Sequence, residues 1–392
     1  CRFYDVTAEG NFEGANILNI KQPLKQIAEE LKMSPQQLSE ILDRGRQQLF
    51  EERSKRIKPN RDEKILTSWN GMMAISFIEA AQVLQRTDYL EVARRNINFI
   101  LKQLCQGHQI FRTHKDGQSK IKGYLDDYAN LVEALLALYQ ATGDSSWLEQ
   151  AVLYNQEMLQ QFWNADEKGF FLTGDEHEKL VTQVRDIYDN AVPAGNSVAV
   201  FNLLKLAVLT GNKDYREKAE VNLQQMYQPL TRHPSGFGYL LESADFYLGP
   251  VKEIVVVGDP EADDTKGLLA TIYRGFLPNK VVAILDPDHP HGQHPTETKT
   301  QDNANLQRLR SKAGGKDSGN FKDPKAKKSY LSSKQITTSL ILTPQLSHES
   351  LLLEGKTLIK GKPAVYVCQN YTCKAPVTEP SQLAKALGQN EN

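Results

Sequence analysis

The chain has 392 residues, of which 47 are basic and 48 acidic, so its formal net charge at pH 7 is −1. This balance argues against the basic surface typical of proteins that bind nucleic acid or an anionic membrane. No apolar run approaches the roughly 20 residues needed to cross a bilayer, and no secretory signal is visible. We therefore expect a globular protein with neither nucleic acid nor a membrane among its partners.

Cysteine usage predicts ordinary thiols. Four cysteines are too few for a disulfide framework, which indicates a reducing compartment, and we expect the cytoplasm. Cys368 and Cys373 enclose four residues, not the two of a redox or zinc motif. No glycine-rich fingerprint follows Gly258, so dinucleotide binding is not expected. We expect no metal and no cofactor.

The N-terminal region begins with loop and short strand over residues 1–20. In its acidic turn at residues 9–14, Glu13 is a weak candidate for substrate binding. Ser34 then predicts an N-cap and Pro35 the first residue of a charged helix that runs to about Arg56.

Three later segments repeat one helix-pair pattern, beginning at Ala74, Leu131 and Ala199. In each pair the first helix is apolar around most of its circumference, and the second has one apolar face. This predicts inner and outer helices of stacked hairpins, as in a solenoid or a closed toroid. Such an architecture gathers the loops of several repeats around one place.

The composition changes after Pro250. Residues 253–259 and 279–286 predict buried strands and residues 263–276 a helix, which together make a β-α-β unit. Residues 287–334 are poor in hydrophobic side chains and predict a disordered insertion. The predicted divisions are a helical region at 1–248, the β-α-β unit at 249–286, the insertion, and a strand and helix within 335–392 that complete the α/β unit.

Polar clusters precede the inner helix of each repeat. Asp126 and Asp127 open the second inner helix, followed by Tyr128. The two carboxylates could cap the helix, or could act as general acid and base or bind sugar hydroxyls in a central cavity. We treat both as catalytic candidates and Tyr128 as a substrate-binding candidate.

The loop before the third inner helix carries more polar groups than one cap requires. Asp189 is its catalytic candidate; the substrate-binding candidates are Arg185, Asn190, Asn196 and Ser197. Before the first inner helix, Trp69 offers an aromatic face that could stack on a sugar or lie in the core, and Asn70 offers a donor and an acceptor. Because the three clusters share one phase of the repeat, we expect them to meet at one end of the stack.

Six ordered blocks of sequence resemble one known family. They are YDVTAEGNFEGANIL, KILTSWNGMMA, YLDDYANLVEALLALYQATGD, DNAVPAGNSVAVFNLLKL, EIVVVGDP with FLPNKVV, and AVYVCQNYTCKAPV. On these blocks the chain resembles the thioredoxin-domain-containing family of spermatogenesis-associated protein 20, also called the YyaL family. The usual Asp-Gly-Ala-x-Pro-Ser run of that family is replaced here by residues 189–194, and the insertion at 287–334 is unusual.

The resemblance implies a mainly α fold, an (α/α)6 toroid like that of six-hairpin glycosidases, with a small C-terminal α/β unit. Family members carry a thioredoxin-like domain and early hairpins before the block that matches residues 1–18, so we expect a partial toroid here. An open hairpin edge predicts self-association or a partner, either a thioredoxin-like domain or the upstream toroid segment.

Three functional hypotheses follow. The first is a carbohydrate-active enzyme of carbohydrate metabolism that binds a small sugar and uses carboxylate acid–base chemistry. The second is a non-catalytic binding or scaffold module that works with a thioredoxin-like domain. The third is an epimerase or isomerase of N-acyl sugars, which normally requires histidines in the cavity.

Overall fold

The computed structural model describes residues 1–174, 176–178, 181–289 and 352–389. They form two compact units, Cys1–Glu63 and Lys64–Asn392. The predicted disordered insertion lies outside the described residues except at 287–289, and so does the start of the predicted C-terminal segment. The helical region predicted at 1–248 is divided at residue 63, because residues 1–63 have a small core of their own, made by Phe3, Ile27, Ala28 and Leu38.

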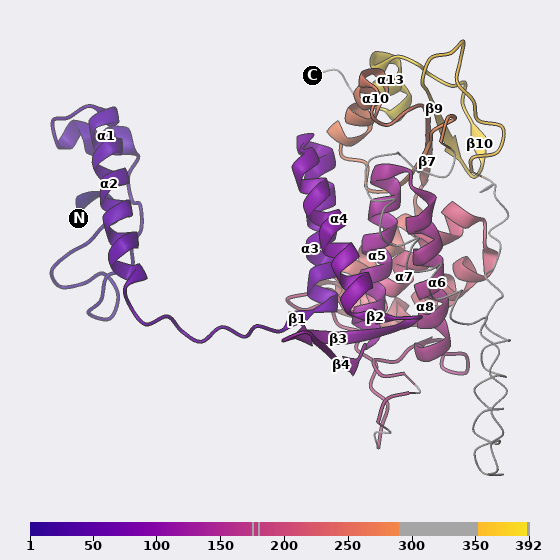
Figure 1. Ribbon diagram of the computed structural model, residues 1–392, viewed down its shortest axis with the longest axis horizontal. Coiled ribbons are helices and arrows are strands. Elements are labelled where there is room, and N and C mark those ends of the chain that lie inside the picture. The colour runs from indigo at the N-terminus through magenta and orange to yellow at the C-terminus, as the bar shows by residue number, and fades with distance from the viewer. Residues whose placement is uncertain (175, 179–180, 290–351, 390–392) are drawn as a thin grey trace, which may run out of the picture. The chain divides into compact units, whose positions relative to one another are not determined.

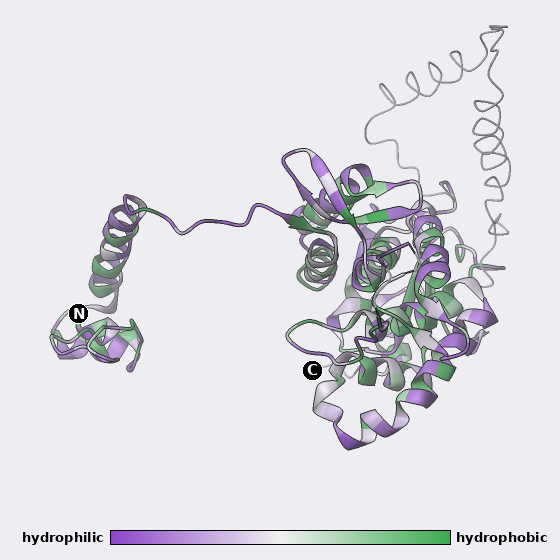
Figure 2. Cartoon of the chain, turned by 90° about the horizontal axis from the view of Figure 1, so that it is seen from below, coloured by the Kyte–Doolittle hydropathy of each residue, from purple (hydrophilic) through white to green (hydrophobic). Residues whose placement is uncertain are grey.

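The first unit contains η1 (Arg2–Tyr4), α1 (Leu24–Glu30) and α2 (Pro35–Ser54). The predicted cap of α2 is confirmed: the Ser34 hydroxyl accepts the Gln37 N–H at 3.1 Å, and the Gln37 side chain accepts the Ser34 N–H at 2.9 Å. Hydrophilic residues predominate on this helix, as expected for a largely solvated element (Figure 2).

Helical hairpins make up most of the second unit (Figure 1). The inner helices are α3 (Thr67–Leu84), α5 (Leu125–Thr142) and α7 (Gly195–Thr210), and the outer helices are α4 (Thr87–Gln103), α6 (Ser145–Phe162) and α8 (Lys213–Arg232). Each inner helix packs against the next, and a further helix, α9 (Gly238–Leu248), packs against α7. The predicted mainly α fold of stacked hairpins is confirmed, whereas α9 was not predicted.

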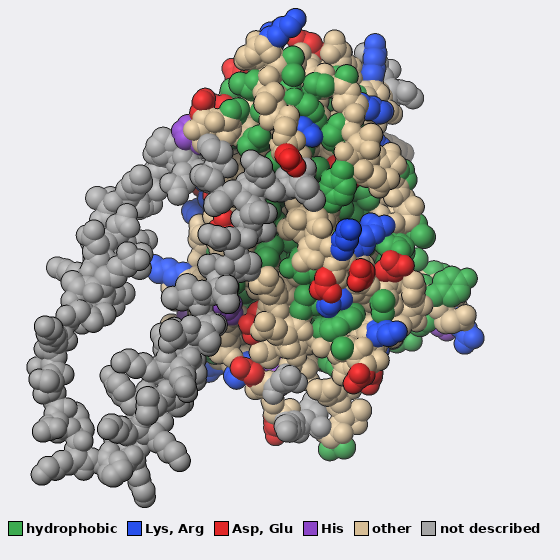
Figure 3. Space-filling model, turned by 90° about the vertical axis from the view of Figure 1, so that its right-hand side faces the viewer, with side chains coloured by type: hydrophobic (Ala, Val, Ile, Leu, Met, Phe, Trp, Pro, Cys, Tyr) green, Lys and Arg blue, Asp and Glu red, His purple; other side chains and the backbone are tan. Residues whose placement is uncertain are grey.

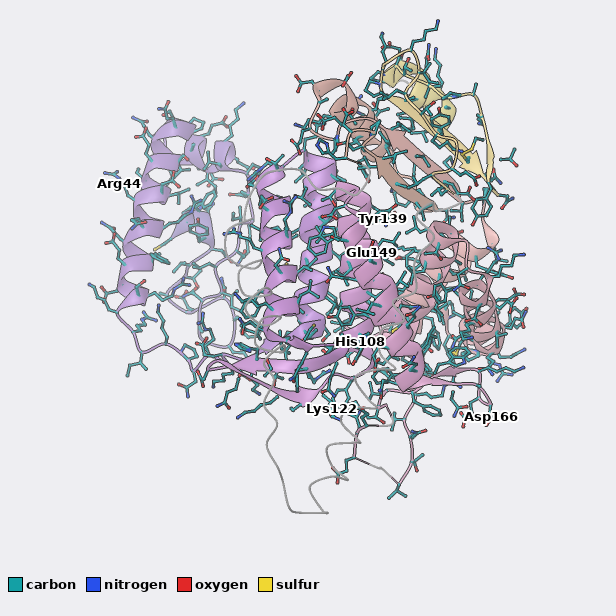
Figure 4. All side chains as sticks on the ribbon, turned by 45° about the vertical axis from the view of Figure 1, so that its right-hand side comes forward. Arg44, His108, Lys122, Tyr139, Glu149 and Asp166 are labelled. Carbon is teal, nitrogen blue, oxygen red and sulfur yellow. A yellow bond between two sulfur atoms is a disulfide. The ribbon has the colours of Figure 1, made fainter. Side chains whose placement is uncertain are left out.

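Burial explains the two layers. Most residues of α5 and α7 are buried, because these helices are enclosed on several sides. The outer helix α6 buries one face, which includes Trp147, Leu148, Val152 and Phe162. Figure 4 shows that Tyr139, near the end of α5, and Glu149, near the start of α6, lie at the same end of the stack, as an antiparallel hairpin requires.

Short β elements lie where the inner helices begin. The strands β1 (Ile65–Leu66), β2 (Cys105–Gln106), β3 (Gln109–Lys115) and β4 (Gln118–Lys122) form an antiparallel sheet. A second pair, β5 (Trp163–Asn164) and β6 (Gly169–Phe170), follows α6. The β3–β4 hairpin was not predicted, because its polar residues show no clear alternation of hydrophobic and polar positions.

The predicted α/β unit is confirmed at the opposite end of the hairpins (Figure 1). The strands β7 (Lys252–Val257) and β8 (Lys280–Leu285) are parallel and connected by α10 (Asp263–Arg274). The strand β9 (Ala364–Gln369) pairs antiparallel with β7, and β10 (Thr372–Cys373) pairs with β9 at the edge of the sheet. The helix α13 (Pro380–Leu387) packs against α10. One face of this sheet packs on the helical core and the other on α10 and α13.

The expectation of free thiols at Cys368 and Cys373 is wrong. A two-residue turn places these residues directly opposite one another on β9 and β10, and they form a disulfide bond. An interval of four residues does not fit a metal or redox motif, but it does fit a tight β-hairpin in which the two cysteines flank the paired positions next to the turn. Cys1 and Cys105 are free.

Within the described residues, no helix is long and apolar enough to span a bilayer. On the face of the second unit shown in Figure 3, basic and acidic side chains are interspersed rather than separated by sign.

Gly143 provides a test of how the hairpins meet the α/β sheet. It ends α5 with φ of +73°, and a Cβ atom there would lie 2.9 Å from both the Cβ and the carbonyl oxygen of Ile284. Gly117 has the same φ of +73° but open space around it. We expect Gly117→Ala to lower the free energy of unfolding by about 1–2 kcal/mol through backbone strain. Gly143→Ala should lower the free energy of unfolding by about 1–3 kcal/mol more than Gly117→Ala does, because its added methyl group overpacks the contact.

Chemical denaturation of both variants measures this difference. Equal losses would show that the contact between α5 and β8 does not contribute to stability.

Candidate functional site

The three polar clusters meet at one end of the hairpin stack. The backbone N–H of Ser68 donates to Oδ1 of Asp127 at 3.0 Å, which joins the starts of α3 and α5. A Cβ on Gly195, the first residue of α7, would lie 2.9 Å from the Asp126 nitrogen, so the starts of α5 and α7 also touch. Figure 4 shows His108 and Lys122 at this same end of the molecule.

Asp127 connects several elements through its carboxylate. It is fully buried and accepts the Tyr124 N–H at 3.0 Å and the Arg112 guanidinium at 2.9 Å, in addition to Ser68. Burial and the neighbouring Asp126 raise its pKa to about 6, while Arg112 and the two N–H donors act in the opposite direction. With this set of donors, Asp127 acts as a cap and a link between elements.

Asp126 is the more accessible carboxylate of the pair, with 24% of its side chain exposed. Nη1 of Arg112 donates to its two oxygens at 3.0 and 3.1 Å, a charge-assisted contact. Arg112 also lies over the ring of Tyr124, 4.8 Å from the centroid, and Tyr124 stacks on His177 at 5.0 Å. This stacking holds Arg112, and with it Asp126, in a defined place.

Asp189 also acts as a cap. Its carboxylate accepts the N–H of Ala194 at 2.8 Å, of Tyr239 at 2.9 Å and of Leu240 at 3.2 Å. The last two donors belong to the first turn of α9, whose free N–H groups favour a carboxylate. Asp189 thereby holds the 189–194 loop against a helix that the sequence did not predict.

Asp186 is a carboxylate that the sequence analysis did not select. It is partly exposed, and its pKa is raised by burial, then by the charges of Asp126 and Asp189. Among the described residues, no hydrogen bond or ion pair to its side chain is present. Its position in the sequence does not predict a functional role. The charge of Asp126 acts on it only in the folded chain, because the two residues belong to different repeats.

Arg185 lies close to β6. Its Nη2 atom is 1.9 Å from the place that a Cβ on Gly169 would occupy, so a larger residue there would displace the guanidinium. Its Nε and Nη2 atoms are buried and have no hydrogen-bond partner within the described part of the chain. A partly buried guanidinium with unused donors can bind an anionic or hydroxylated ligand.

The aromatic and amide candidates differ in accessibility. Trp69 is 60% exposed, so its ring is available for stacking. Asn70 donates to the Leu66 carbonyl at 2.8 Å and borders a cavity of about 450 Å³ that also contains Lys64 and Arg95 in its wall. Asn190 is exposed, and its side-chain amide donates to the Tyr188 carbonyl at 3.3 Å.

Three other candidates are core residues. Tyr128 is buried, and its hydroxyl accepts the Ile110 N–H at 3.1 Å. Asn196 is buried and pairs with Asn222 through two hydrogen bonds of 3.3 and 3.2 Å. Ser197 is also fully buried. Glu13 is exposed and belongs to the first unit, Cys1–Glu63.

A second group of ionisable residues lies along the inner helices and was missed by the sequence analysis. Glu133 of α5 is buried, accepts the Tyr239 hydroxyl, and lies 3.1 Å from Nζ of Lys205 on α7. Burial raises the pKa of Glu242 on α9, with Lys205 opposing and Glu133 adding to the shift. Single charged residues within the apolar runs of α5 and α7 were the signal that could have identified Glu133 and Lys205.

The described residues contain no group of three or more histidine, cysteine, aspartate or glutamate side chains arranged to hold a metal ion. Two histidines near the stack, His114 and His177, have structural contacts. His177 accepts the Gly174 N–H at 3.1 Å and contacts the Lys122 carbonyl at 3.2 Å, and His114 pairs with Ser119 at 2.9 Å.

Comparison with known proteins finds relatives for nearly the whole chain. The chain is 26% identical over 390 residues to spermatogenesis-associated protein 20 of Homo sapiens and 27% identical over 392 residues to that of Rattus norvegicus. These alignments cover 97% of the chain, which spans 43% of the length of each relative. No family model matches the chain.

Solved structures give weaker similarities. An α-mannanase of glycoside hydrolase family 76 from Bacteroides thetaiotaomicron matches with a TM-score of 0.40 and 15% identity, over 55% of this chain and 59% of that one. A cellobiose 2-epimerase from Bacillus thermoamylovorans matches with a TM-score of 0.37 and 12% identity, over 43% and 46%. At these TM-scores, neither similarity bears on the function of the chain.

The capping role of Asp189 has a direct test. We expect Asp189→Ala to lower the free energy of unfolding by about 2 kcal/mol, because three N–H donors lose their acceptor. Asn190→Ala is the matched control and should change it by less than about 0.5 kcal/mol, since this neighbour is exposed. Thermal and urea unfolding measure both, and an unchanged stability of Asp189→Ala would contradict the capping role.

Proposed function

The chain belongs to the family of spermatogenesis-associated protein 20, a name that states no reaction, and from its own side chains we propose a carbohydrate-active enzyme. The proposed site lies where α5 and α7 begin. The observation that carries the proposal is a pair of partly exposed carboxylates with different surroundings: Asp126 is paired with Arg112, and Asp186 has a pKa raised by burial and by the charge of Asp126.

These surroundings suit acid–base catalysis. Asp126 is paired with the guanidinium of Arg112, whereas burial and neighbouring carboxylates raise the pKa of Asp186 and favour its protonated form. A carboxylic acid beside a carboxylate is the arrangement that glycoside hydrolysis uses to protonate a leaving oxygen and to activate water or stabilise the positive charge on the sugar. In this proposal Asp186 is the acid and Asp126 the base, while Asp127 and Asp189 position their loops.

Ligand binding would use aromatic and donor side chains from the same end of the hairpin stack. Trp69 and Tyr188 are 60% and 50% exposed and offer aromatic faces of the kind that stack on sugar rings. The unused donors of Arg185 suit hydroxyl groups. We place the proposed enzyme in the cytoplasm.

Epimerase chemistry has less support. That hypothesis requires a histidine free to move a proton, and both ring nitrogens of His177 already contact backbone groups. We therefore prefer the hydrolysis or transfer of a glycoside as the proposed reaction, over the epimerisation of an N-acyl sugar.

The hydrolytic proposal is tested with a panel of 4-nitrophenyl α- and β-glycosides. We expect the wild-type protein to cleave at least one of them, and Asp186→Asn to lower kcat by about 100-fold or more through loss of the general acid. Asp166→Asn, a change at an exposed turn, is the control and should retain full activity.

Thermal shifts with the same sugars separate binding from chemistry. Asp186→Asn should retain the shift, and Trp69→Ala should weaken it. No cleavage and no thermal shift with any sugar would contradict the proposal.

A second candidate, a binding module that assembles without catalysis, is favoured by the exposed apolar side chains of α3. Trp69, Met73, Val83 and Leu84 are each between 55% and 61% exposed. Apolar patches of this kind commonly mark sites where another protein binds. The partner could be a second copy, a thioredoxin-like domain, or further hairpins.

Self-association is the simplest form of this second candidate. We expect the wild-type chain to elute as a dimer or larger, and the double variant Trp69→Ser and Leu84→Ser to shift towards the monomer, because the apolar contact area is reduced. Size-exclusion chromatography with light scattering gives the mass. A wild-type monomer at every concentration would contradict self-association through α3.

A further inference from the structure

One row of side chains crosses three strands at the edge of the α/β sheet. Glu253 on β7 is paired directly with Cys368 on β9, and Cys368 is paired directly with Cys373 on β10. Directly opposed residues in antiparallel strands point to the same face, with Cβ atoms about 5 Å apart. A carboxyl group and a disulfide bond therefore lie side by side.

The two sulfur atoms differ in accessibility. Cys368 is 2% exposed and belongs to the core between the sheet and the helical hairpins, whereas Cys373 is partly exposed. The strand that carries Cys373 is the edge strand of its sheet. A thiol that approaches from solvent would therefore attack Cys373 and displace Cys368, because access determines which sulfur is attacked.

Glu253 is held against the hairpin that carries the disulfide. Its Oε2 atom accepts the Tyr371 N–H at 2.9 Å, and only 4% of the residue is exposed. Asn370 and Tyr371 form the two-residue turn, with φ of +50° and +58°, which directs its N–H groups to this carboxyl. Burial raises the pKa of Glu253, against the effects of the two N–H donors and of Lys356.

We propose that Glu253, Cys368 and Cys373 form a thiol–disulfide exchange site that is reduced by a dithiol, with Glu253 as proton donor to the sulfur of Cys368. This inference does not depend on the proposed carbohydrate activity, since it concerns the opposite end of the hairpins.

The exchange balances in two steps. One sulfur of the dithiol attacks Sγ of Cys373 as a thiolate, a mixed disulfide forms, the Cys368–Cys373 bond breaks, and Cys368 leaves with the electron pair and takes the proton of Glu253. The second sulfur of the dithiol then attacks the mixed disulfide and releases Cys373 as a thiol. The dithiol is oxidised to a disulfide, and the cysteine pair gains two electrons. The two protons lost by the dithiol equal the two protons gained by Cys368 and Cys373, once solvent has reprotonated Glu253.

The leaving sulfur explains the need for a proton donor. A thiolate at Cys368 would be formed in a buried place, where a charge is unfavourable. The free Cys105 shows the effect of such surroundings, because burial raises its pKa to about 11. A protonated carboxyl beside Cys368 removes this barrier.

The first measurement is the number of thiols in the whole chain. Protein purified in air and alkylated under denaturing conditions should carry two modified cysteines, Cys1 and Cys105, and after treatment with dithiothreitol it should carry four. Four modified cysteines without reductant would overturn the proposal.

The second measurement is the rate of reduction by dithiothreitol, followed by alkylation and mass spectrometry. We expect Glu253→Gln to react roughly tenfold more slowly than wild type at pH 6, a modest share of what a general acid can contribute. Glu261→Gln, at an exposed glutamate, is the matched control and should react at the wild-type rate.

The pH profile distinguishes proton transfer from positioning. The charged and titratable groups that act on Glu253 are Lys356 and, at the turn, Tyr371. The ratio of wild-type to Glu253→Gln rates should fall towards one as the pH rises through the pKa of Glu253, since the carboxylate has no proton to give. A ratio of one throughout, or a constant ratio at all pH values, would overturn the role of Glu253.

If Glu253→Gln fails to fold by circular dichroism, Glu253→Asp takes its place. This variant retains a carboxyl group and should retain the pH dependence of the wild-type rate. A profile without that dependence would likewise overturn the proposal.

Discussion

The carboxylate of Asp127 receives hydrogen bonds from three elements, and the arrangement of the site depends on them. Ser68 begins α3, Tyr124 precedes α5, and Arg112 comes from β3. A fully buried carboxylate is unfavourable unless its oxygens are satisfied, so each of these donors must stay in place. The start of one hairpin is thereby fixed to the start of the next, and Arg112 is held where it also reaches Asp126.

The acidic residues at this end of the stack divide into two kinds. Asp127 and Asp189 accept several donors each and hold helix starts and loops together. Asp126 and Asp186 are partly exposed, and the charge of Asp126 adds to the effect of burial in raising the pKa of Asp186. All four residues are aspartates near the start of an inner helix. The two kinds differ in the number of hydrogen-bond donors around each carboxylate.

The α/β unit contributes a different chemistry at the other end of the hairpins. Gly143 allows β8 to approach α5 closely, and one face of the sheet becomes part of the helical core. Burial at that interface gives Cys368 and Glu253 surroundings in which a charge is unfavourable. The disulfide, the carboxyl and the tight turn at Asn370 and Tyr371 are thus parts of one local structure.

The sequence by itself determined the features that depend on near neighbours in the chain. The cap at Ser34, the apolar inner helices and the parallel strands around α10 all follow from local spacing and residue type. The same spacing predicted that the polar clusters share one end of the stack, since each occupies the same phase of its repeat.

Only the tertiary structure decided which side chains have which partners. Asp189 caps α9, Glu133 meets Lys205 and Tyr239, and Glu253 lies beside Cys368 across more than 100 residues of sequence. Local pattern carries no information about such pairs, because hydrogen-bond satisfaction, burial and charge proximity depend on how separate elements pack. For that reason the sequence predicted that the polar clusters meet at one end of the stack, whereas the packing determines the partners of each carboxylate there.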